Sequence, residues 1–168
     1  FRDVNGRMGR LLIMLMMCDS GLLPEPYLYP SSYFNRYRDE YTDRLLAVSR
    51  DDAWEEWLIF FLRGIFQQAE EAFSRACELL DLRDEYRDRY QDGANSVSHL
   101  STAIFTKPYI TVNEARDVLD MTYNAANNAV GKLEEDGVLE EVTGQRRNRV
   151  FRAREVFDII QKPAGELK

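Results

Sequence analysis

The sequence predicts a mainly α-helical protein in two parts, with a small β-hairpin near the C-terminus. Three observations predict this class. Apolar residues recur every three or four positions along most of residues 7–80, which is the period of helices that bury one face. A capping-box pattern, Thr111 to Glu114, opens a second group of short helices. Residues 138–142 and 149–153 flank a polar turn in the manner of two hairpin strands.

The first part begins with a polar loop over residues 1–6. A helix of roughly 7–20 follows, and Gly21 is its expected C-terminal glycine. Residues 22–30 hold three prolines and are expected to be irregular, because proline lacks a backbone N–H and fixes φ.

Two further helices complete the first part. Ser31–Ser32 is the expected N-cap of a helix over about 32–48. Asp51–Asp52 is expected to cap the next helix, whose apolar stripe from Trp54 to Leu80 predicts a buried core face. Residues 83–92 are densely charged, as in a frayed helix end or a linker.

The segment Asp92-Gly93-Ala94-Asn95 is the best candidate for a domain boundary, so we expect domains over 1–93 and 94–168. Thr111 and Thr122 are expected helix N-caps, and Gly137 is expected to end a helix. The elements predicted in the second domain are helices over 96–105, 111–119 and 123–136, strands over 138–142 and 149–153, and a closing helix over 155–161. This order is that of a winged helix-turn-helix.

Composition excludes some classes of protein. The chain has 22 Lys and Arg against 29 Asp and Glu, a net charge of −7, which disfavours general nucleic-acid binding. Cys18 and Cys77 lie in apolar helical patterns and are expected to be buried free thiols of a reducing compartment. His99 is expected at the surface. Because no apolar run reaches the ~20 residues that span a bilayer, we expect a cytoplasmic protein with no membrane partner.

The first ten residues have the chemistry of a phosphate-binding loop ahead of a helix. Asn5 and Gly6 allow backbone N–H groups to approach an anion, and the helix directs its positive end toward the same place. Arg7 and Arg10 are three apart, hence neighbours on one helix face, and each can fork onto phosphate oxygens. Asp3 is a carboxylate of the kind that holds Mg²⁺. The same spacing equally fits a capped helix start whose arginines are solvated or paired with carboxylates.

The run Phe1-x-Asp3-Val4-Asn5-Gly6-Arg7-x-x-Arg10 resembles the Fic family motif His-Pro-Phe-x-Asp-Gly-Asn-Gly-Arg-x-x-Arg. Residues 23–41, the Trp54–Trp57 helix and the winged-helix tail are also similar to this family of AMP-transferring enzymes. The resemblance implies transfer of AMP from ATP to a Ser, Thr or Tyr hydroxyl of a protein target. It implies Mg²⁺ on Asp3 and nucleotide binding by Asn5, Gly6, Arg7, Gly9, Arg10 and Tyr41.

Two departures from the motif qualify this expectation. Val4 stands where the family has glycine, which adds a β-branched side chain to a loop that needs close backbone approach. The family's general-base histidine would lie two positions before Phe1. We therefore expect a fragment of an adenylyltransferase that is inactive by itself and that self-associates as a homo-oligomer through the apolar face of residues 11–17.

The predicted winged helix suggests a function from another class, that of a DNA-binding transcriptional regulator. Amides on the third helix could read base edges, and arginines of the wing could meet phosphates. The residues proposed for this role are Asn124, Asn127, Asn128, Lys132, Arg146, Arg147 and Arg149. Carboxylates between the two surfaces, Glu134 to Asp136 and Glu140–Glu141, favour the alternative of a protein-docking or dimerisation module.

Overall fold

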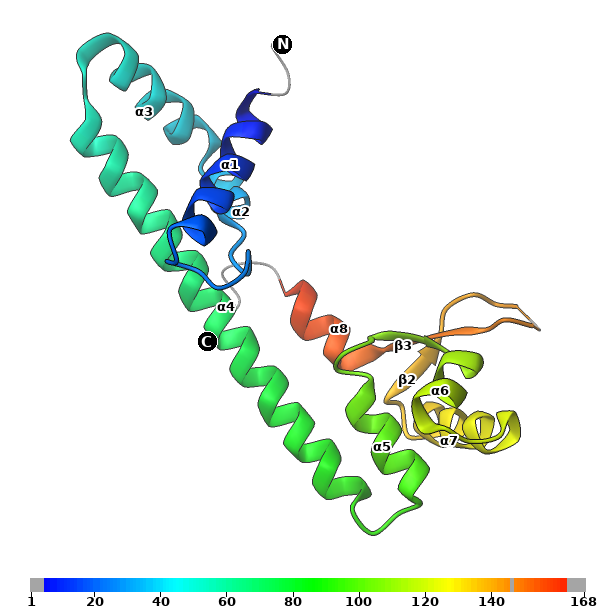
Figure 1. Cartoon of the computed structure of the whole chain (residues 1–168). Coiled ribbons are helices and arrows are strands. Elements are labelled where there is room, and N and C mark those ends of the chain that lie inside the picture. The colour runs from blue at the N-terminus through cyan, green and yellow to red at the C-terminus, as the bar shows by residue number, and fades with distance from the viewer. Residues whose placement is uncertain (1–4, 146, 163–168) are drawn as a thin grey trace. The chain divides into compact units, whose positions relative to one another are not determined.

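The computed structural model describes residues 5–145 and 147–162, with the backbone only for Asn5. These residues form a mainly helical protein with one small antiparallel sheet, which confirms the predicted fold class (Figure 1). The chain divides into two compact units at Ser74 and Arg75, inside one long helix. The division precedes the expected boundary at residues 92–95, because Tyr86 and Tyr90, near the end of that helix, belong to the C-terminal core.

All the regular secondary structure described in the N-terminal unit is helical. It contains α1 (Asn5–Asp19), α2 (Pro30–Arg36), α3 (Arg38–Asp51) and the first part of α4 (Trp54–Tyr90). Helix α1 begins two residues before the expected start, and it ends before Gly21, whose φ of 74° is the left-handed value that a terminating glycine supplies.

An aromatic cluster forms the core of this unit. Tyr33 and Phe34 of α2 and Phe60 of α4 are at most 3% exposed. The ring centroids of Tyr33 and Phe60 lie 5.4 Å apart, a distance at which tilted aromatic pairs are favourable. Their partly buried neighbours are Tyr41, Trp57 and Phe61.

Two capping predictions in this unit are wrong. Pro30, rather than Ser31–Ser32, opens α2, because proline suits the first helical turn, where its missing N–H costs nothing. Asp51 closes α3, and Asp52, with a left-handed φ of 55°, ends that helix instead of capping the next one.

The helix expected over residues 32–48 is divided at Tyr37, whose ψ of 45° is not helical. The bend brings Phe34 of α2 and Tyr41 of α3 to a centroid separation of 5.2 Å. Both rings then reach α4, Phe34 at Phe61 and Tyr41 at Trp57.

The expectation that the whole apolar stripe of α4 lies in the core is wrong among the described residues. Leu62, Phe66 and Phe73 expose 60%, 63% and 72% of their surface. Both cysteines are free, as expected, although Cys18 and Cys77 are half-buried and not buried.

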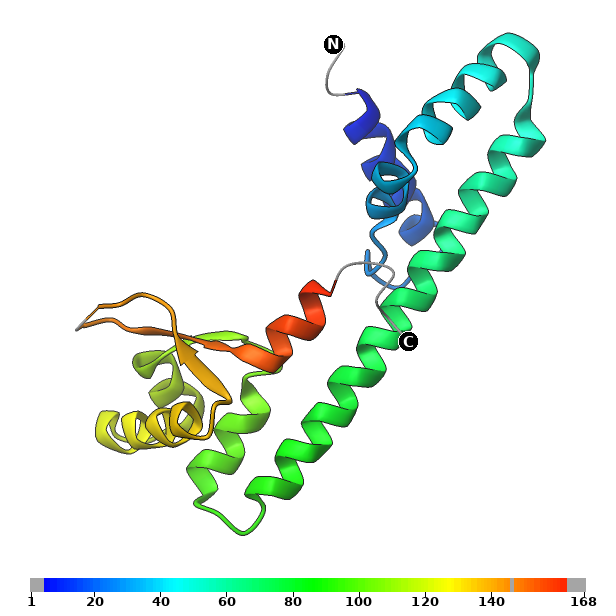
Figure 2. The same ribbon diagram turned by 180° about the vertical axis from the view of Figure 1, so that it is seen from behind.

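The C-terminal unit adds the elements of a winged helix to the end of α4. They are α5 (Asn95–Ala103), β1 (Tyr109–Thr111), α6 (Val112–Leu119), α7 (Tyr123–Glu135), β2 (Leu139–Glu141), β3 (Val150–Ala153) and α8 (Arg154–Gln161). Helices α5, α6 and α7 pack on one another, as Figures 1 and 2 show from opposite sides. The sheet order is β1-β3-β2, with both pairings antiparallel.

Local hydrogen bonds start and stop these helices as predicted. The Thr111 hydroxyl accepts from the N–H of Glu114 at 3.2 Å, and the Glu114 carboxylate accepts from the N–H of Thr111 at 2.8 Å. These bonds from Thr111 hold the pKa of the Glu114 carboxyl below its ordinary value. The Thr122 hydroxyl caps α7 by accepting from the N–H of Ala125, and Gly137 ends the following turn at φ 75°.

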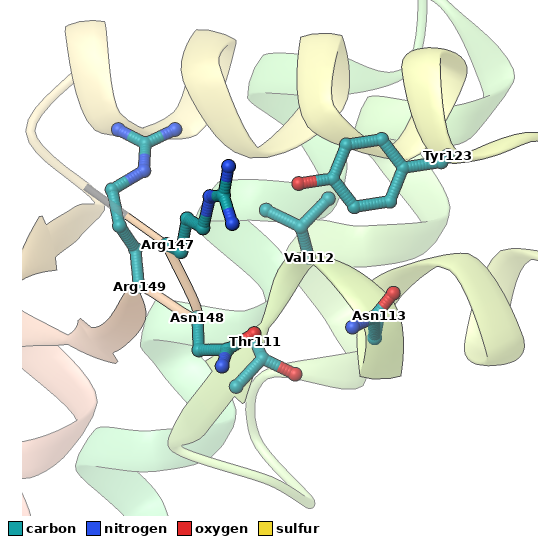
Figure 3. Close-up of a pocket in the computed structure, with 7 residues that line it drawn as sticks. All are labelled: Thr111, Val112, Asn113, Tyr123, Arg147, Asn148 and Arg149. Atoms are coloured by element: carbon teal, nitrogen blue, oxygen red, sulfur yellow. The ribbon is translucent and has the colours of Figure 1, made fainter. Parts of the chain in front are cut away.

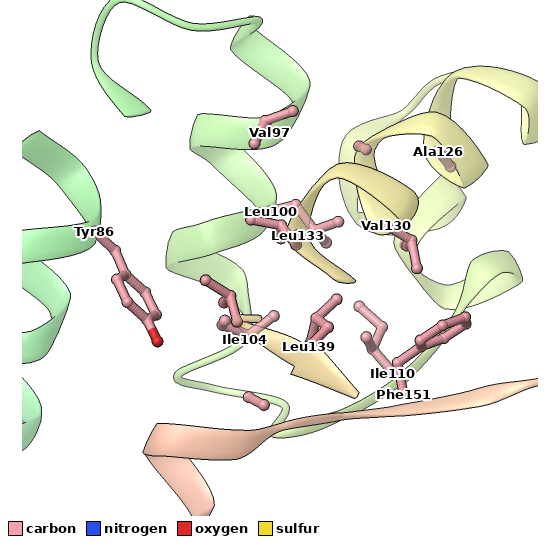
Figure 4. Packing of buried hydrophobic residues seen from close by; sticks show 14 of the residues in the cluster. Tyr86, Val97, Leu100, Ile104, Ile110, Ala126, Val130, Leu133, Leu139 and Phe151 are labelled. Atoms are coloured by element: carbon pink, nitrogen blue, oxygen red, sulfur yellow. The ribbon is translucent and has the colours of Figure 1, made fainter. Parts of the chain in front are cut away.

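Strand β1 was not among the predicted elements, which placed no strand between the helices expected over 96–105 and 111–119. It forms because Ile110 pairs with Phe151 of β3, 41 positions along the chain. Both of these residues are fully buried in the C-terminal core, together with Leu100 and Leu133 (Figure 4).

Two tyrosines join the end of α4 to this core. The Tyr86 hydroxyl donates to Glu155 of α8 and the Tyr90 hydroxyl donates to Asp136, each at 2.9 Å. Burial and the bond to Asp136 raise the pKa of Tyr90 to about 12. The charged segment 83–92 is therefore neither frayed nor a linker up to residue 90: it is helical and carries core side chains.

Candidate functional site

A pocket of about 460 Å³ lies between α1, α2 and the segment that joins them, in the N-terminal unit. This volume is within the range of small-molecule sites. The residues that line it are Arg7, Arg10, Leu11, Met14, Pro26, Leu28, Tyr29, Pro30, Ser31 and Asn35. The sequence-predicted arginines therefore share one cavity.

Arg10 is held in place by a neighbour from α2. Its Nε donates to the Ser31 hydroxyl at 3.1 Å, which leaves the two terminal nitrogens of the guanidinium for other acceptors. A methyl group added at Gly6 would lie 3.6 Å from Nη1 of Arg10, so the guanidinium lies beside the first turn of α1. Arg7, one turn earlier, is exposed. One guanidinium held by a hydrogen bond and one exposed guanidinium thus lie on the same helix face.

The pocket is positively charged on a chain with a net charge of −7. None of its ten lining residues is Asp or Glu. The first turn of α1 adds N–H groups without helical partners and the positive end of the helix dipole. Tyr29 and Leu28 provide an apolar surface on which an aromatic ring could lie. The arrangement suits an anion with a flat organic group attached.

The other predicted nucleotide-binding residues fall in different places. Asn5 is the first residue of α1, and Gly6 is helical instead of part of a loop. Gly9 has open space around it. Tyr41 is not among the pocket residues, because it packs between Phe34 and Trp57 in the aromatic cluster. The expected magnesium ligand, Asp3, lies outside the described residues.

Sequence reasoning missed Tyr29, Ser31 and Asn35. They come from the end of the proline-rich segment and from α2, about 20 positions after the arginines. The only sign of them in the sequence was a hydroxyl and an amide that follow a rigid Pro-rich turn. Residue spacing does not show which helix such a turn packs against.

Within residues 5–145 and 147–162, no three His, Cys, Asp or Glu side chains come together as a metal site would require. The described polar groups of the pocket, two guanidinium groups, two hydroxyls and an amide, fit an anionic ligand and do not provide a cation site by themselves.

The winged helix has a second polar pocket, of about 240 Å³, where the wing meets α6 and α7 (Figure 3). It is lined by Thr111, Val112, Asn113, Tyr123, Arg147, Asn148 and Arg149, again without a carboxylate. The base of the wing is ordered by Glu141, which accepts from the N–H groups of Thr143 at 2.8 Å and Gly144 at 3.0 Å.

Several of the residues expected to bind DNA have partners within the protein. Arg149 donates to Asn127 at 3.5 Å, and its guanidinium lies 5.0 Å from the centroid of the Phe151 ring. Lys132 pairs with Asp136 at 2.8 Å. These three polar side chains of the expected set are thus occupied in the free protein.

The remaining members of that set differ in accessibility. Asn124, Asn128 and Arg147 are exposed, and Arg147 lines the pocket of the wing. Arg146 lies outside the described residues. Two of the carboxylates expected to oppose DNA are engaged as well: Glu140 forms an ion pair with Arg152, and the pKa of Glu141 is lowered by its bonds from Thr143.

A search against models of protein families finds no match to this chain. In the described part of the chain, every helix is too short or too polar to cross a membrane.

Proposed function

We propose that the N-terminal unit binds the phosphate groups of ATP in a site of the Fic type, in which AMP passes from ATP to a hydroxyl of a target protein. The observation that carries this proposal is that Arg7 and Arg10 line one pocket and that none of the described residues beside them there is acidic, on an acidic chain. The resemblance of residues 1–10 to the Fic motif supplies the class of reaction.

The residues of the pocket have different tasks in this proposal. Arg10, fixed by Ser31, presents two N–H donors to phosphate oxygens without a large loss of side-chain freedom on binding. Arg7 is exposed and reaches the terminal phosphate, where charge accumulates on the departing diphosphate. Tyr29 and Leu28 contact the nucleoside.

Bound Mg²⁺ would neutralise the diphosphate, with Asp3 as its ligand from this chain. In this proposal the described residues of the pocket bind and orient the nucleotide, and none of them is assigned removal of the proton from the target hydroxyl.

Isothermal titration calorimetry of the chain with ATP and Mg²⁺ tests the binding step. We expect Arg7→Ala and Arg10→Ala each to weaken binding roughly tenfold to a hundredfold, the range for a hydrogen bond to a charged group. Ser31→Ala is expected to cause a smaller loss of ATP affinity, because Arg10 keeps its charge and loses only its hydrogen bond to the Ser31 hydroxyl. Arg50→Ala, an exposed arginine at the end of α3, is the matched control and should bind as the unchanged chain does.

Absence of heat with ATP would contradict the proposal, as would equal affinity for adenosine and ATP, since the arginines act on phosphate.

A second candidate function, DNA binding by the winged helix, is favoured by the carboxylate-free pocket that Arg147 and Arg149 line. Phosphate oxygens of a duplex would accept from Arg147, with the exposed amides of Asn124 and Asn128 beside the groove.

An electrophoretic shift of DNA fragments at low salt tests this candidate. We expect binding to weaken steeply as salt rises, and Arg147→Ala to reduce it at every sequence, because a phosphate contact carries no base information. Arg87→Ala, an exposed arginine of α4, serves as control. If no shift occurs at low salt, or if Arg147→Ala does not change it, DNA binding is contradicted and the alternative of a protein-docking module is favoured.

A further inference from the structure

One face of α4 is covered by other helices of the N-terminal unit. Phe60, Gly64, Gln68 and Glu71 are buried on this face. The buried carboxylate of Glu71 accepts from Gln68 at 2.7 Å and from Arg36 of α2 at 3.4 Å. Both the apolar and the polar groups of this face therefore have their partners inside the unit.

The opposite face of α4 carries an apolar seam that no other described residue of the N-terminal unit covers. The α4 seam consists of Ile59, Leu62, Phe66, Ala69 and Phe73, all of them exposed. Its spacings alternate between three and four residues, the period of 3.5 that keeps an apolar line facing a partner helix. Exposed apolar lines of this length mark interaction sites.

We propose that the α4 seam pairs with the α4 seam of a second copy of this chain, and that the two helices run antiparallel. In the register that sets Phe66 of one copy opposite Ala69 of the other, Leu62 faces Phe73. Each phenylalanine then meets a smaller residue, so the layers have similar volumes. A parallel pair would stack Phe66 on itself and Ala69 on itself, which alternates crowded layers with empty ones.

Charge supports the same register. Arg63 and Glu70 flank the α4 seam on one side, are exposed, and form no ion pair with another described residue. The antiparallel register brings Arg63 of each copy next to Glu70 of the other, which gives two ion pairs across the interface. A parallel pair places both residues beside apolar side chains such as Leu58 and Ile65, where neither charge gains a partner.

Sedimentation of the full chain tests the proposal, and charge reversal tests the register. We expect a dimer whose dissociation constant rises roughly tenfold for Arg63→Glu and for Glu70→Arg, because each change places two like-charged pairs in contact. The double variant Arg63→Glu/Glu70→Arg is expected to restore the original constant. Asp43→Arg, an exposed charge of α3, should leave it unchanged.

A matched pair of apolar changes completes the test. Phe73 and Leu22 are each 72% exposed, so replacing either with Glu leaves the fold intact, as circular dichroism will show. Phe73→Glu is expected to weaken the dimer at least about a hundredfold, and Leu22→Glu to leave it intact. A monomer at the highest concentration the assay reaches overturns the proposal, as does a dimer that Phe73→Glu does not weaken or a double charge reversal that fails to restore association.

Discussion

Gly64 allows α4 to lie against α2 at a distance that no other residue permits. A Cβ at this position would lie 2.6 Å from Cδ1 of Tyr33 and 3.0 Å from Cε1. The ring has little room to retreat, because it is 3% exposed and packs on Tyr37 at 4.7 Å and Phe60 at 5.4 Å between centroids. Gly64→Ala is therefore expected to destabilise the N-terminal unit.

Two opposing terms set the magnitude. Alanine in place of glycine inside a helix favours folding by about 1 kcal/mol. Contacts well inside van der Waals distance with a fixed ring cost roughly 2 to 3 kcal/mol, in the upper part of the range for overpacking. The expected net loss is about 1 to 2 kcal/mol, which lowers the melting temperature of a unit of this size by roughly 4 to 8 °C per kcal/mol.

Tryptophan fluorescence during urea or thermal unfolding measures this change in the relevant unit. The chain has two tryptophans, Trp54 and Trp57, and both lie in the N-terminal unit. The ring of Trp57 is 6.1 Å from that of Phe60, so its emission follows the aromatic cluster that the substitution disturbs.

Gly131→Ala is the matched control. Gly131 is also inside a helix, but nothing lies within 4 Å of an added Cβ, so the substitution should stabilise the C-terminal unit by about 1 kcal/mol. It should not lower the tryptophan midpoint. Should Gly64→Ala prove neutral or stabilising in the unchanged background, the close contact with Tyr33 would not exist and the reasoning would be refuted. In a Tyr33→Ala background, the same substitution should change sign and become stabilising.

Three further predictions concern single side chains. Because Tyr90 is buried and bonded to Asp136, its folded pKa of about 12 exceeds the unfolded value of about 10. The stability that this difference provides is full below about pH 10 and is lost as the pH rises toward about 12. Tyr90→Phe should therefore reduce the loss of stability between about pH 9 and 11, as measured by denaturation at both pH values. Thr111→Val removes the N-cap of α6 and should cost about 1 kcal/mol by far-UV circular dichroism. Arg36→Met leaves the buried Glu71 carboxylate with one partner and should cost about 1 to 3 kcal/mol by tryptophan fluorescence, whereas a stable variant would show that Arg36 adds nothing.

Elements whose causes are local could be predicted from the sequence. Thr111 and Glu114 are three residues apart, and each bonds to the backbone of the other, so their pattern is sufficient to start α6. Thr122, Gly21 and Gly137 act in the same way, through their own backbone or the next turn. In each case, the interacting groups are neighbours in the chain.

Elements that depend on contacts between residues far apart in the chain could not be predicted from the sequence. Strand β1 exists because Ile110 pairs with Phe151; its three residues favour a strand by propensity, but so short a run does not indicate one without its partner. The bend at Tyr37 depends on rings of α4 that Phe34 and Tyr41 reach together. The apolar period of α4 predicted its helix correctly but not which part of its surface the N-terminal unit covers.

The candidate site also has local features that the sequence predicts and long-range contacts that it does not. The sequence by itself determined that Arg7 and Arg10 share a helix face next to a glycine, because helical spacing and residue chemistry are local properties. Only the tertiary structure decided that Ser31 bonds to Arg10 and that Tyr29 lines the same pocket, since these contacts join segments about 20 residues apart. Such contacts depend on which surfaces bury one another, and burial is a property of the folded chain as a whole.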